Sequence, residues 1–390
     1  MAKRKHPILA NKTLMALARG LYGKRYFTKK VKLVSDGSLA KIRPPYVVVA
    51  NHCGFVDVGG MVMMLKNNCG SFVISVTQMA NWPSAIKHMG VLAKKQFTVD
   101  VNLIKDIKYV LSKGRPVIIY PEAKLSVVGT PNVIKPAVAK LIKLLKVPLI
   151  TVRFDGSYLH QPRWSKIRRF CPVQTTVKVA VTEDEIGKIS VDEIHRRIVQ
   201  DLTFDDYQYQ LDNKISIDVP DLVVGLENIL YKCPQCGVEY KITSADRTLT
   251  CTNCGAQTSM NQYGQLEGGK FNKVTDWYAW QHRCVKQELL QGYTYEHDFV
   301  AEELIGKKYV SQGDAKLTYK DGKIDITLSS GRVISYARDA FYTLSFNNDY
   351  LFFPVEEGIM RLKRTSDPGC TTKLNIAVEE QTKIDEGEKL

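Results

Sequence analysis

Hydrophobic residues in the first half of the chain form short, almost unbroken runs, with helical segments between them. The runs are rich in β-branched residues and lie at 46–50, 71–75, 116–120, 147–154 and 175–181. Segments such as 102–113 and 135–146 separate them. Near-continuous apolar strands alternating with helices are typical of a largely parallel sheet flanked by helices. We therefore predict an α/β domain over residues 35–185.

The first 34 residues combine a helical apolar pattern with a basic composition. The apolar positions recur at three- and four-residue spacing: Leu14, Leu17, Ala18, Leu21 and Tyr22. The segment contains ten Lys and Arg, and the first acidic residue is Asp36. Such a helix suits an anionic membrane surface, although a helix packed on its own domain shows the same amphipathicity. The absence of acidic residues favours a membrane-associating segment over residues 1–34.

The second half of the chain contains several segments of different composition. We expect a polar helical connector over 186–228, a cysteine-containing ribbon over 229–262, and a helix followed by a small antiparallel β-domain over 263–390. Asp321-Gly322 is a hairpin turn signal within that β-domain. An acidic tail, which we expect to fray, begins at Glu379.

Charge is distributed unevenly over the 390 residues. Residues 1–170 carry 30 Lys and Arg against 6 Asp and Glu, a net charge of +24, whereas the rest carries 25 against 34, a net charge of −9. This asymmetry indicates that the N-terminal part meets an anionic partner. A nucleic-acid-binding ribbon is disfavoured, because such proteins place their basic residues on the binding module and this ribbon lies in the acidic half.

Targeting signals are not evident in the sequence. No stretch reaches about 18 consecutive apolar residues, and the N-terminus lacks the apolar core of a signal peptide. We therefore expect a cytoplasmic protein that is peripheral on the inner face of the cell membrane.

Four cysteines have the spacing of a zinc site. Cys233 and Cys236 form one C-x-x-C pair, Cys251 and Cys254 form a second, and a glycine follows each pair. Tetrahedral zinc is commonly held by two such knuckles, each supplying two thiolates from a tight turn. A site with four thiolates is closed to substrate, so we predict one structural Zn²⁺ in a zinc ribbon.

A histidine and an aspartate follow the first apolar run. In "NHCGFVD", His52 comes just after the run, and Asp57 lies at the start of the next helical segment. A neutral imidazole is a good base near pH 7, and a carboxylate can fix its tautomer. Read alone, such a pair is more often an ordinary turn and helix cap than a catalytic pair, because Asp is a standard residue at helix starts. Glu122 follows the run 116–120, so both sites fall at the same edge of a parallel sheet.

Four blocks in this region resemble those of the glycerolipid acyltransferases, which include the 1-acylglycerol-3-phosphate acyltransferases. "NHCGFVD" resembles the family's histidine–four residues–aspartate motif, "GVLAKKQFTVD" (90–100) its second block, "YPEAKLS" (120–126) its third, and "VPLITV" (147–152) its fourth. The resemblance spans roughly residues 40–185. It implies transfer of a fatty acyl group from acyl-CoA or acyl-carrier protein to the hydroxyl of a lysophospholipid, with 1-acyl-glycerol-3-phosphate as the leading acceptor.

Roles for individual residues follow from the same resemblance. His52 is the implied general base, Asp57 orients it, and Glu122 binds the acceptor. The family usually has Gly-Thr-Arg where this chain has Ala123, Lys124 and Leu125, and no arginine occurs between Arg43 and Arg115.

The missing arginine bears on how the acceptor is bound. Lys94, Lys95 and Lys124 could supply the missing positive charge, but a lysine offers a point charge rather than a bidentate fork. The altered blocks leave a non-catalytic binding protein as an alternative.

Overall fold

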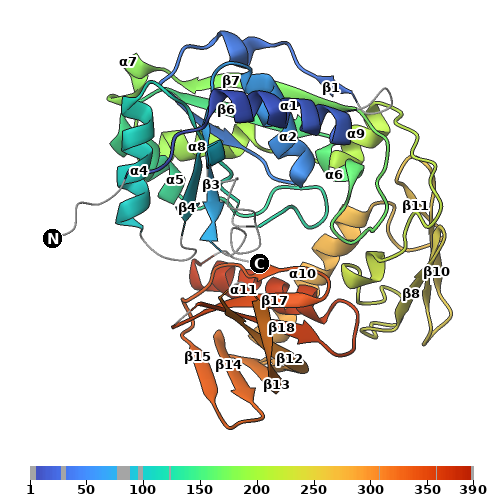
Figure 1. The fold of residues 1–390 in the computed structure, drawn as a ribbon. Coiled ribbons are helices and arrows are strands. Elements are labelled where there is room, and N and C mark those ends of the chain that lie inside the picture. The colour runs from blue at the N-terminus through green and yellow to red at the C-terminus, as the bar shows by residue number, and fades with distance from the viewer. Residues whose placement is uncertain are drawn as a thin grey trace. The chain divides into compact units, whose positions relative to one another are not determined.

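The computed structural model describes residues 6–27, 32–76, 88–94, 100–122, 124–306, 308–356 and 358–387. The chain forms two compact units (Figure 1). The first comprises residues 1–160 and 169–209, and the second comprises residues 161–168 and 210–390.

The first unit is built on a seven-stranded sheet that is mostly parallel, as predicted. Its order is β1-β7-β6-β2-β5-β3-β4. Among the described strands the antiparallel pairing is that of β6 with β7, so β7 and its parallel neighbour β1 run opposite to the other five strands. The strands are β1 (Leu33–Val34), β2 (Val47–Ala50), β3 (Ser71–Ser75), β4 (Val91–Lys94), β5 (Val117–Ile119), β6 (Leu149–Asp155) and β7 (Val173–Val181). Because β2, β5 and β6 are parallel neighbours, their carboxyl ends meet at one edge of the sheet.

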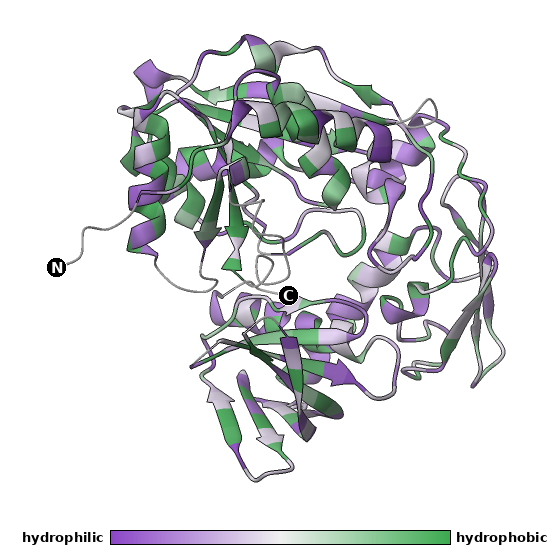
Figure 2. Cartoon of the chain, viewed as in Figure 1, coloured by the Kyte–Doolittle hydropathy of each residue, from purple (hydrophilic) through white to green (hydrophobic). Residues whose placement is uncertain are grey.

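Helices cover both faces of this sheet, and the alternation of side chains along β2 shows how. Val48 and Ala50 join the core beneath α1 (Lys12–Tyr26) and α2 (Phe55–Leu65). Val47 and Val49 join the core beneath α4 (Val101–Ser112), α5 (Ala137–Leu145) and α8 (Val191–Asp201). Burial on both faces explains why β2 is an unbroken apolar run. In Figure 2 the central strands are accordingly mostly green.

Two adjacent glycines in α2 allow close packing on either side of the helix. A Cβ added at Gly59 would lie 2.9 Å from the ring of Tyr22 in α1, and one at Gly60 would lie 2.8 Å from the ring of Phe154 in β6. Both distances are too short for a real Cβ. The Gly59-Gly60 pair therefore lets α2 fit between α1 and the sheet, which fixes the position of the turn that precedes α2.

The faces of α1 have different environments. Met15 and Ala18 are buried, whereas Leu17 and Leu21 are 60% and 61% exposed. Arg19 donates a hydrogen bond to the carbonyl of Lys66 just beyond α2. The apolar residues of the predicted stripe therefore divide between packing on the domain and exposure. No helix in the described part of the chain has the length and hydropathy needed to span a membrane.

Residues that we placed in a polar connector also contribute to the core of the first unit. Ile194 and Ile198 of α8 are fully buried with the core side chains of α4 and α5. The described residues also form the short helices α6 (Ser157–His160) and α7 (Glu183–Ile186) and a 3-10 turn, η1 (Ser38–Lys41), in this unit, and α9 (Asp206–Asp212) at its end.

The second unit contains the cysteine ribbon and a β-rich part. The ribbon is a four-stranded sheet of β8 (Ile242–Ala245), β9 (Thr248–Cys251), β10 (Gln257–Met260) and β11 (Leu266–Glu267), preceded by a 3-10 turn, η3 (Leu226–Asn228). The β-rich part is an antiparallel sheet in the order β15-β14-β13-β12-β18-β17-β16. Its strands are β12 (Tyr295–Ile305), β13 (Lys308–Lys320), β14 (Lys323–Leu328), β15 (Val333–Tyr336), β16 (Ser345–Phe346), β17 (Tyr350–Val355) and β18 (Gly358–Arg364). The predicted turn at Asp321-Gly322 joins β13 to β14.

Two helices, α10 (Val274–Leu290) and α11 (Cys370–Asp385), complete the second unit. The expectation of a frayed tail from Glu379 is wrong. Glu379 and Glu380 are buried within α11, where Glu379 accepts a hydrogen bond from Thr343 and Glu380 pairs with His282. These partners offset the free-energy cost of burying the two carboxylates.

Candidate active site

The candidate active site lies at the carboxyl end of β2. The Nδ1 atom of His52 is 2.8 Å from Oδ2 of Asp57. Asp57 is fully buried, whereas the His52 side chain is 24% exposed. No described residue hydrogen-bonds to the other ring nitrogen, Nε2. If Nδ1 carries the proton donated to Asp57, Nε2 is left as the basic nitrogen.

The start of α2 fixes the Asp57 carboxylate. The backbone N–H groups of Cys53 and Gly54 donate to Oδ2 and Oδ1 at 2.8 and 2.9 Å. Asp57 thus caps the helix and holds His52 at the same time. The two interpretations of the "NHCGFVD" segment, a helix cap and an oriented base, are therefore compatible in one arrangement.

Glu122 lies behind His52 rather than in an open position. Its side chain is buried, with Oε1 accepting from the His52 backbone N–H at 3.2 Å and Oε2 accepting from the backbone and side-chain nitrogens of Asn132 at 2.7 and 2.9 Å. Burial raises the pKa of Glu122 to about 7, although these three donors act in the opposite direction. The carboxylate joins the His52 turn to the loop that follows β5, where Ser126 N–H donates to the carbonyl of His52.

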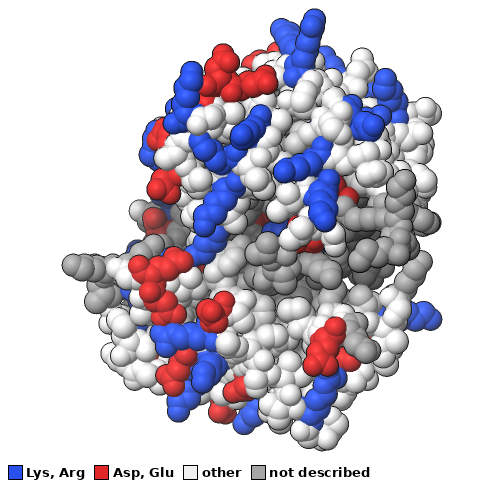
Figure 3. Space-filling model, turned by 90° about the vertical axis from the view of Figure 1, so that its left-hand side faces the viewer, with Lys and Arg blue, Asp and Glu red and all other residues white. Residues whose placement is uncertain are grey.

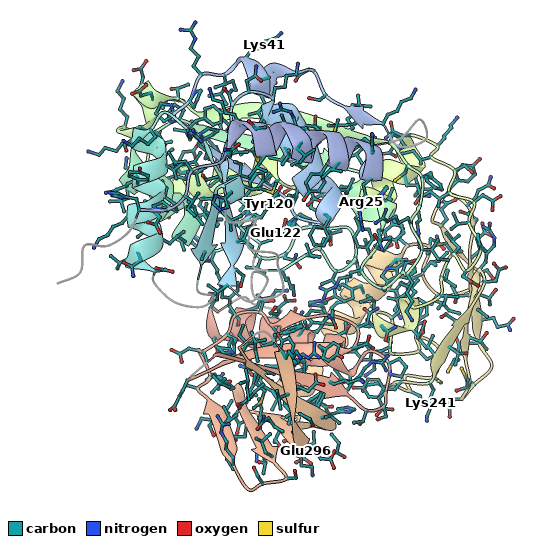
Figure 4. The ribbon with its side chains drawn as sticks, in the orientation of Figure 1. Arg25, Lys41, Tyr120, Glu122, Lys241 and Glu296 are labelled. Carbon is teal, nitrogen blue, oxygen red and sulfur yellow. The ribbon has the colours of Figure 1, made fainter. Side chains whose placement is uncertain are left out.

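Two further side chains surround the histidine. The ring of Tyr120 stacks on the His52 imidazole with centroids 4.2 Å apart. Figure 4 labels Tyr120 and Glu122, which follow β5 at this edge of the sheet. Cys53 is 2% exposed, and burial raises the pKa of its thiol well above the usual range. A thiol that stays protonated is a poor nucleophile.

The three predicted substrate-binding lysines are not equally close to His52. Lys124 is buried in the loop that follows β5. Lys94 ends β4, three strands from β2, or about 14 Å at the usual spacing of strands. Lys95 lies outside the described residues. The structure therefore brings together His52, Asp57 and Glu122, with Lys124 in the adjoining loop.

The four predicted ligand cysteines form a separate cluster in the second unit. The sulfurs of Cys233, Cys236, Cys251 and Cys254 all lie within 4.8 Å of one another. The glycine after each pair has positive φ, 74° at Gly237 and 75° at Gly255, and its N–H donates to the carbonyl of the first cysteine of the pair. Two such turns aim four thiols at one point, so the cluster can bind a metal ion.

Comparison with known proteins assigns a family to the first unit. Residues 24–155 match the family model described as Acyltransferase. This region belongs to the acyltransferase family. The family that the sequence blocks resemble is thus confirmed, and His52, Asp57 and Glu122 all lie inside the matched acyltransferase domain.

The chain is also similar to a solved structure. The crystal structure of the 1-acyl-sn-glycerophosphate (LPA) acyltransferase PlsC from Thermotoga maritima is 20% identical, with a TM-score of 0.39 over 48% of this chain and 76% of that one. No curated protein matches the chain.

The sequence did not reveal the roles of Asn132 and Tyr120. Asn132 holds Glu122 from ten positions along the chain, and Tyr120 stacks on His52 from a neighbouring strand. The only signal for Tyr120 was its place at the start of the third block.

Proposed function

We propose that the protein transfers a fatty acyl group from an acyl thioester, acyl-CoA or acyl-carrier protein, to the hydroxyl of a lysophospholipid in phospholipid biosynthesis. The leading acceptor is 1-acyl-glycerol-3-phosphate. The observation that supports this most directly is the 2.8 Å contact between His52 and Asp57 at the carboxyl end of a parallel strand, within the acyltransferase domain. This contact is what a general base and its orienting carboxylate require.

The proposed reaction needs no acyl-enzyme. The acceptor hydroxyl attacks the thioester carbonyl carbon while its proton moves to Nε2 of His52. Asp57 stabilises the imidazolium through Nδ1–H. When the tetrahedral intermediate collapses, the C–S bond breaks and the departing sulfur takes the proton from Nε2. The products are the ester and the free thiol, and His52 returns to its neutral form.

The test is incubation of the purified full-length protein with acyl-CoA or acyl-carrier protein and a panel of lysophospholipids, with mass analysis of the products. The matched control is the His52→Ala variant under the same conditions. A new diacyl product in the wild-type sample alone supports the proposal. Its absence with every acceptor would favour the non-catalytic alternative.

Two further parts of the proposal concern metal and membrane. We infer that Cys233, Cys236, Cys251 and Cys254 hold one structural Zn²⁺, supported by the convergence of their sulfurs. We also infer peripheral attachment to an anionic membrane, at the inner face of the cell membrane, through the 1–34 segment. The exposed Leu17 and Leu21 and the lack of acidic residues support this attachment.

A further inference from the structure

The imidazole of His52 is held by two contacts that act in different directions. The hydrogen bond from Nδ1 to Asp57 restrains one edge of the ring. This single contact does not stop the ring from tilting out of its plane. The phenol ring of Tyr120 covers one face of the imidazole, with planes inclined by 22° and centroids 4.2 Å apart. A ring at this distance is in contact and prevents rotation toward that side.

Tyr120 is itself held in place by its surroundings. It directly follows β5 and packs against the core cluster that lies beneath α1 and α2. Its hydroxyl oxygen is buried and forms no hydrogen bond with the residues that the structure describes. An unpaired buried hydroxyl does not stabilise the fold. The ring of Tyr120, rather than its hydroxyl, is therefore the part that contributes to the site.

We propose that Tyr120 is a positioning residue for acyl transfer: its ring holds the His52 imidazole so that Nε2 faces the acceptor hydroxyl. This rests on the proposed function of His52 as the base. During transfer the imidazole becomes a cation, and an aromatic face attracts a neighbouring positive charge. The ring thus supports the orientation of His52 before proton transfer and its charge afterwards, while Asp57 acts at the opposite ring nitrogen.

Kinetics of three full-length variants separate the ring from the hydroxyl. Tyr120→Leu should lower kcat by about 10- to 100-fold with little change in KM, as expected for a misplaced catalytic group. Tyr120→Phe keeps the ring and should keep the wild-type kcat. Tyr46→Leu is the matched control, because Tyr46 is a fully buried tyrosine that precedes β2, whereas His52 follows this strand. This control should lose stability and keep kcat.

A spectroscopic measurement tests the stack without any substrate. The ring current of Tyr120 should move the NMR signals of the His52 ring protons upfield in the wild type and in Tyr120→Phe. The shift should vanish in Tyr120→Leu and persist in Tyr46→Leu. The signals are assigned by their loss in His52→Ala.

The outcomes separate this inference from the proposed function. Unshifted His52 signals in the wild type, or full kcat in Tyr120→Leu, would overturn the positioning role. If the wild-type protein transfers no acyl group to any acceptor, the proposed function fails, and the ring-proton shifts still decide whether the stack exists.

Discussion

At the scale of single residues, the proposed chemistry depends on how His52 is held. His52→Ala removes the base from a half-buried turn, so we expect transfer to fall by about 10²- to 10⁴-fold while the protein remains folded. Steady-state assays together with thermal unfolding check both parts. Normal turnover by a folded His52→Ala protein would refute the mechanism.

Asp57→Asn tests the orienting carboxylate separately. The variant should lose activity severely because an amide no longer fixes the tautomer of His52. It should also lose about 1 kcal/mol of stability, because Asp57 caps α2 through Cys53 and Gly54 N–H. A loss of stability with unchanged kcat would show that Asp57 is only a cap.

Glu122 makes the stability of the acyltransferase domain depend on pH. Its folded pKa of about 7 lies above the ordinary value of 4.5, so the folded state binds the proton more tightly than the unfolded state. This preference for the protonated carboxyl contributes stability that is fully present below pH 4.5. The contribution is lost as the pH rises through 7, and the loss is at most about 3 kcal/mol. In Glu122→Gln this loss should disappear.

Urea unfolding at pH 5 and pH 7.5 measures the effect as a difference between wild type and variant. Burial also raises the pKa of Asp206, to about 8, but this contribution is common to both proteins and cancels. Exposed Glu183→Gln is the control and should follow the wild type. Equal pH dependence in wild type and Glu122→Gln would contradict the prediction.

The contrast between His52 and its neighbours shows which site residues a sequence reveals. His52 and Asp57 are five positions apart on one turn and helix start, so local geometry predicts their contact. Asn132 and Tyr120 reach the site through the sheet order and the loop after β5, which spacing along the chain does not encode. The catalytic roles of all these residues stay predictions.

At the scale of elements, burial on two faces made the central strands of the first sheet easy to predict, whereas the edge strands β1 and β4 were missed and the polar helices were harder. The α8 sequence, "VDEIHRRIVQD", is mostly polar, yet two buried isoleucines on one face are enough to anchor it. In α11, Glu379 and Glu380 are buried because partners from other elements satisfy them. The local sequence pattern does not show such partners, because they come from distant parts of the chain.

The division of α1 into a packed and an exposed side predicts how it meets a membrane. Replacing Leu17 and Leu21 by Asp should leave the core contacts of Met15 and Ala18 intact and weaken binding to anionic liposomes. Removal of residues 1–30 should also weaken this binding. Co-sedimentation with phosphatidylglycerol vesicles measures the effect, and binding should fall as salt is added.

The matched control for α1 is Leu144→Asp. Leu144 is 51% exposed, but it lies on α5, which covers the other face of the sheet. This variant should bind vesicles like the wild type. Equal binding of the wild type to neutral and anionic vesicles would contradict the electrostatic part.

At the scale of the whole molecule, basic character is concentrated on the first unit. The part of the view in Figure 3 that this unit occupies carries a broad band of Lys and Arg side chains. The exposed lysines include Lys105 and Lys108 of α4, Lys140 of α5, and Lys146 just after α5. The excess positive charge of the N-terminal part is therefore exposed on the surface of the acyltransferase domain. Such a surface would raise the local concentration of anionic partners.

Contacts within the second unit predict which elements are disturbed when the metal is removed. A ribbon this small buries too little apolar surface to order itself, so its folding should be coupled to Zn²⁺. The ribbon residue Glu239 pairs with Lys373 of α11, whose side chain is only 2% exposed and also contacts Glu288 of α10. Loosening the ribbon leaves Lys373 with one partner fewer, which is costly for a buried charge. The disturbance should therefore extend to α10 and α11.

Chelation of the reduced protein, followed by hydrogen exchange, tests this coupling. We expect rapid exchange in β8–β11 and increased exchange in α11, while β2, β5 and the His52 turn stay protected because the acyltransferase domain has its own core. Acyl transfer should largely persist, and Cys233→Ser with Cys251→Ser should reproduce the pattern without a chelator. Purified protein that contains no zinc, or a disulfide within either C-x-x-C pair, would refute the metal site. A complete and immediate loss of transfer on chelation would instead show that the ribbon supports the active site.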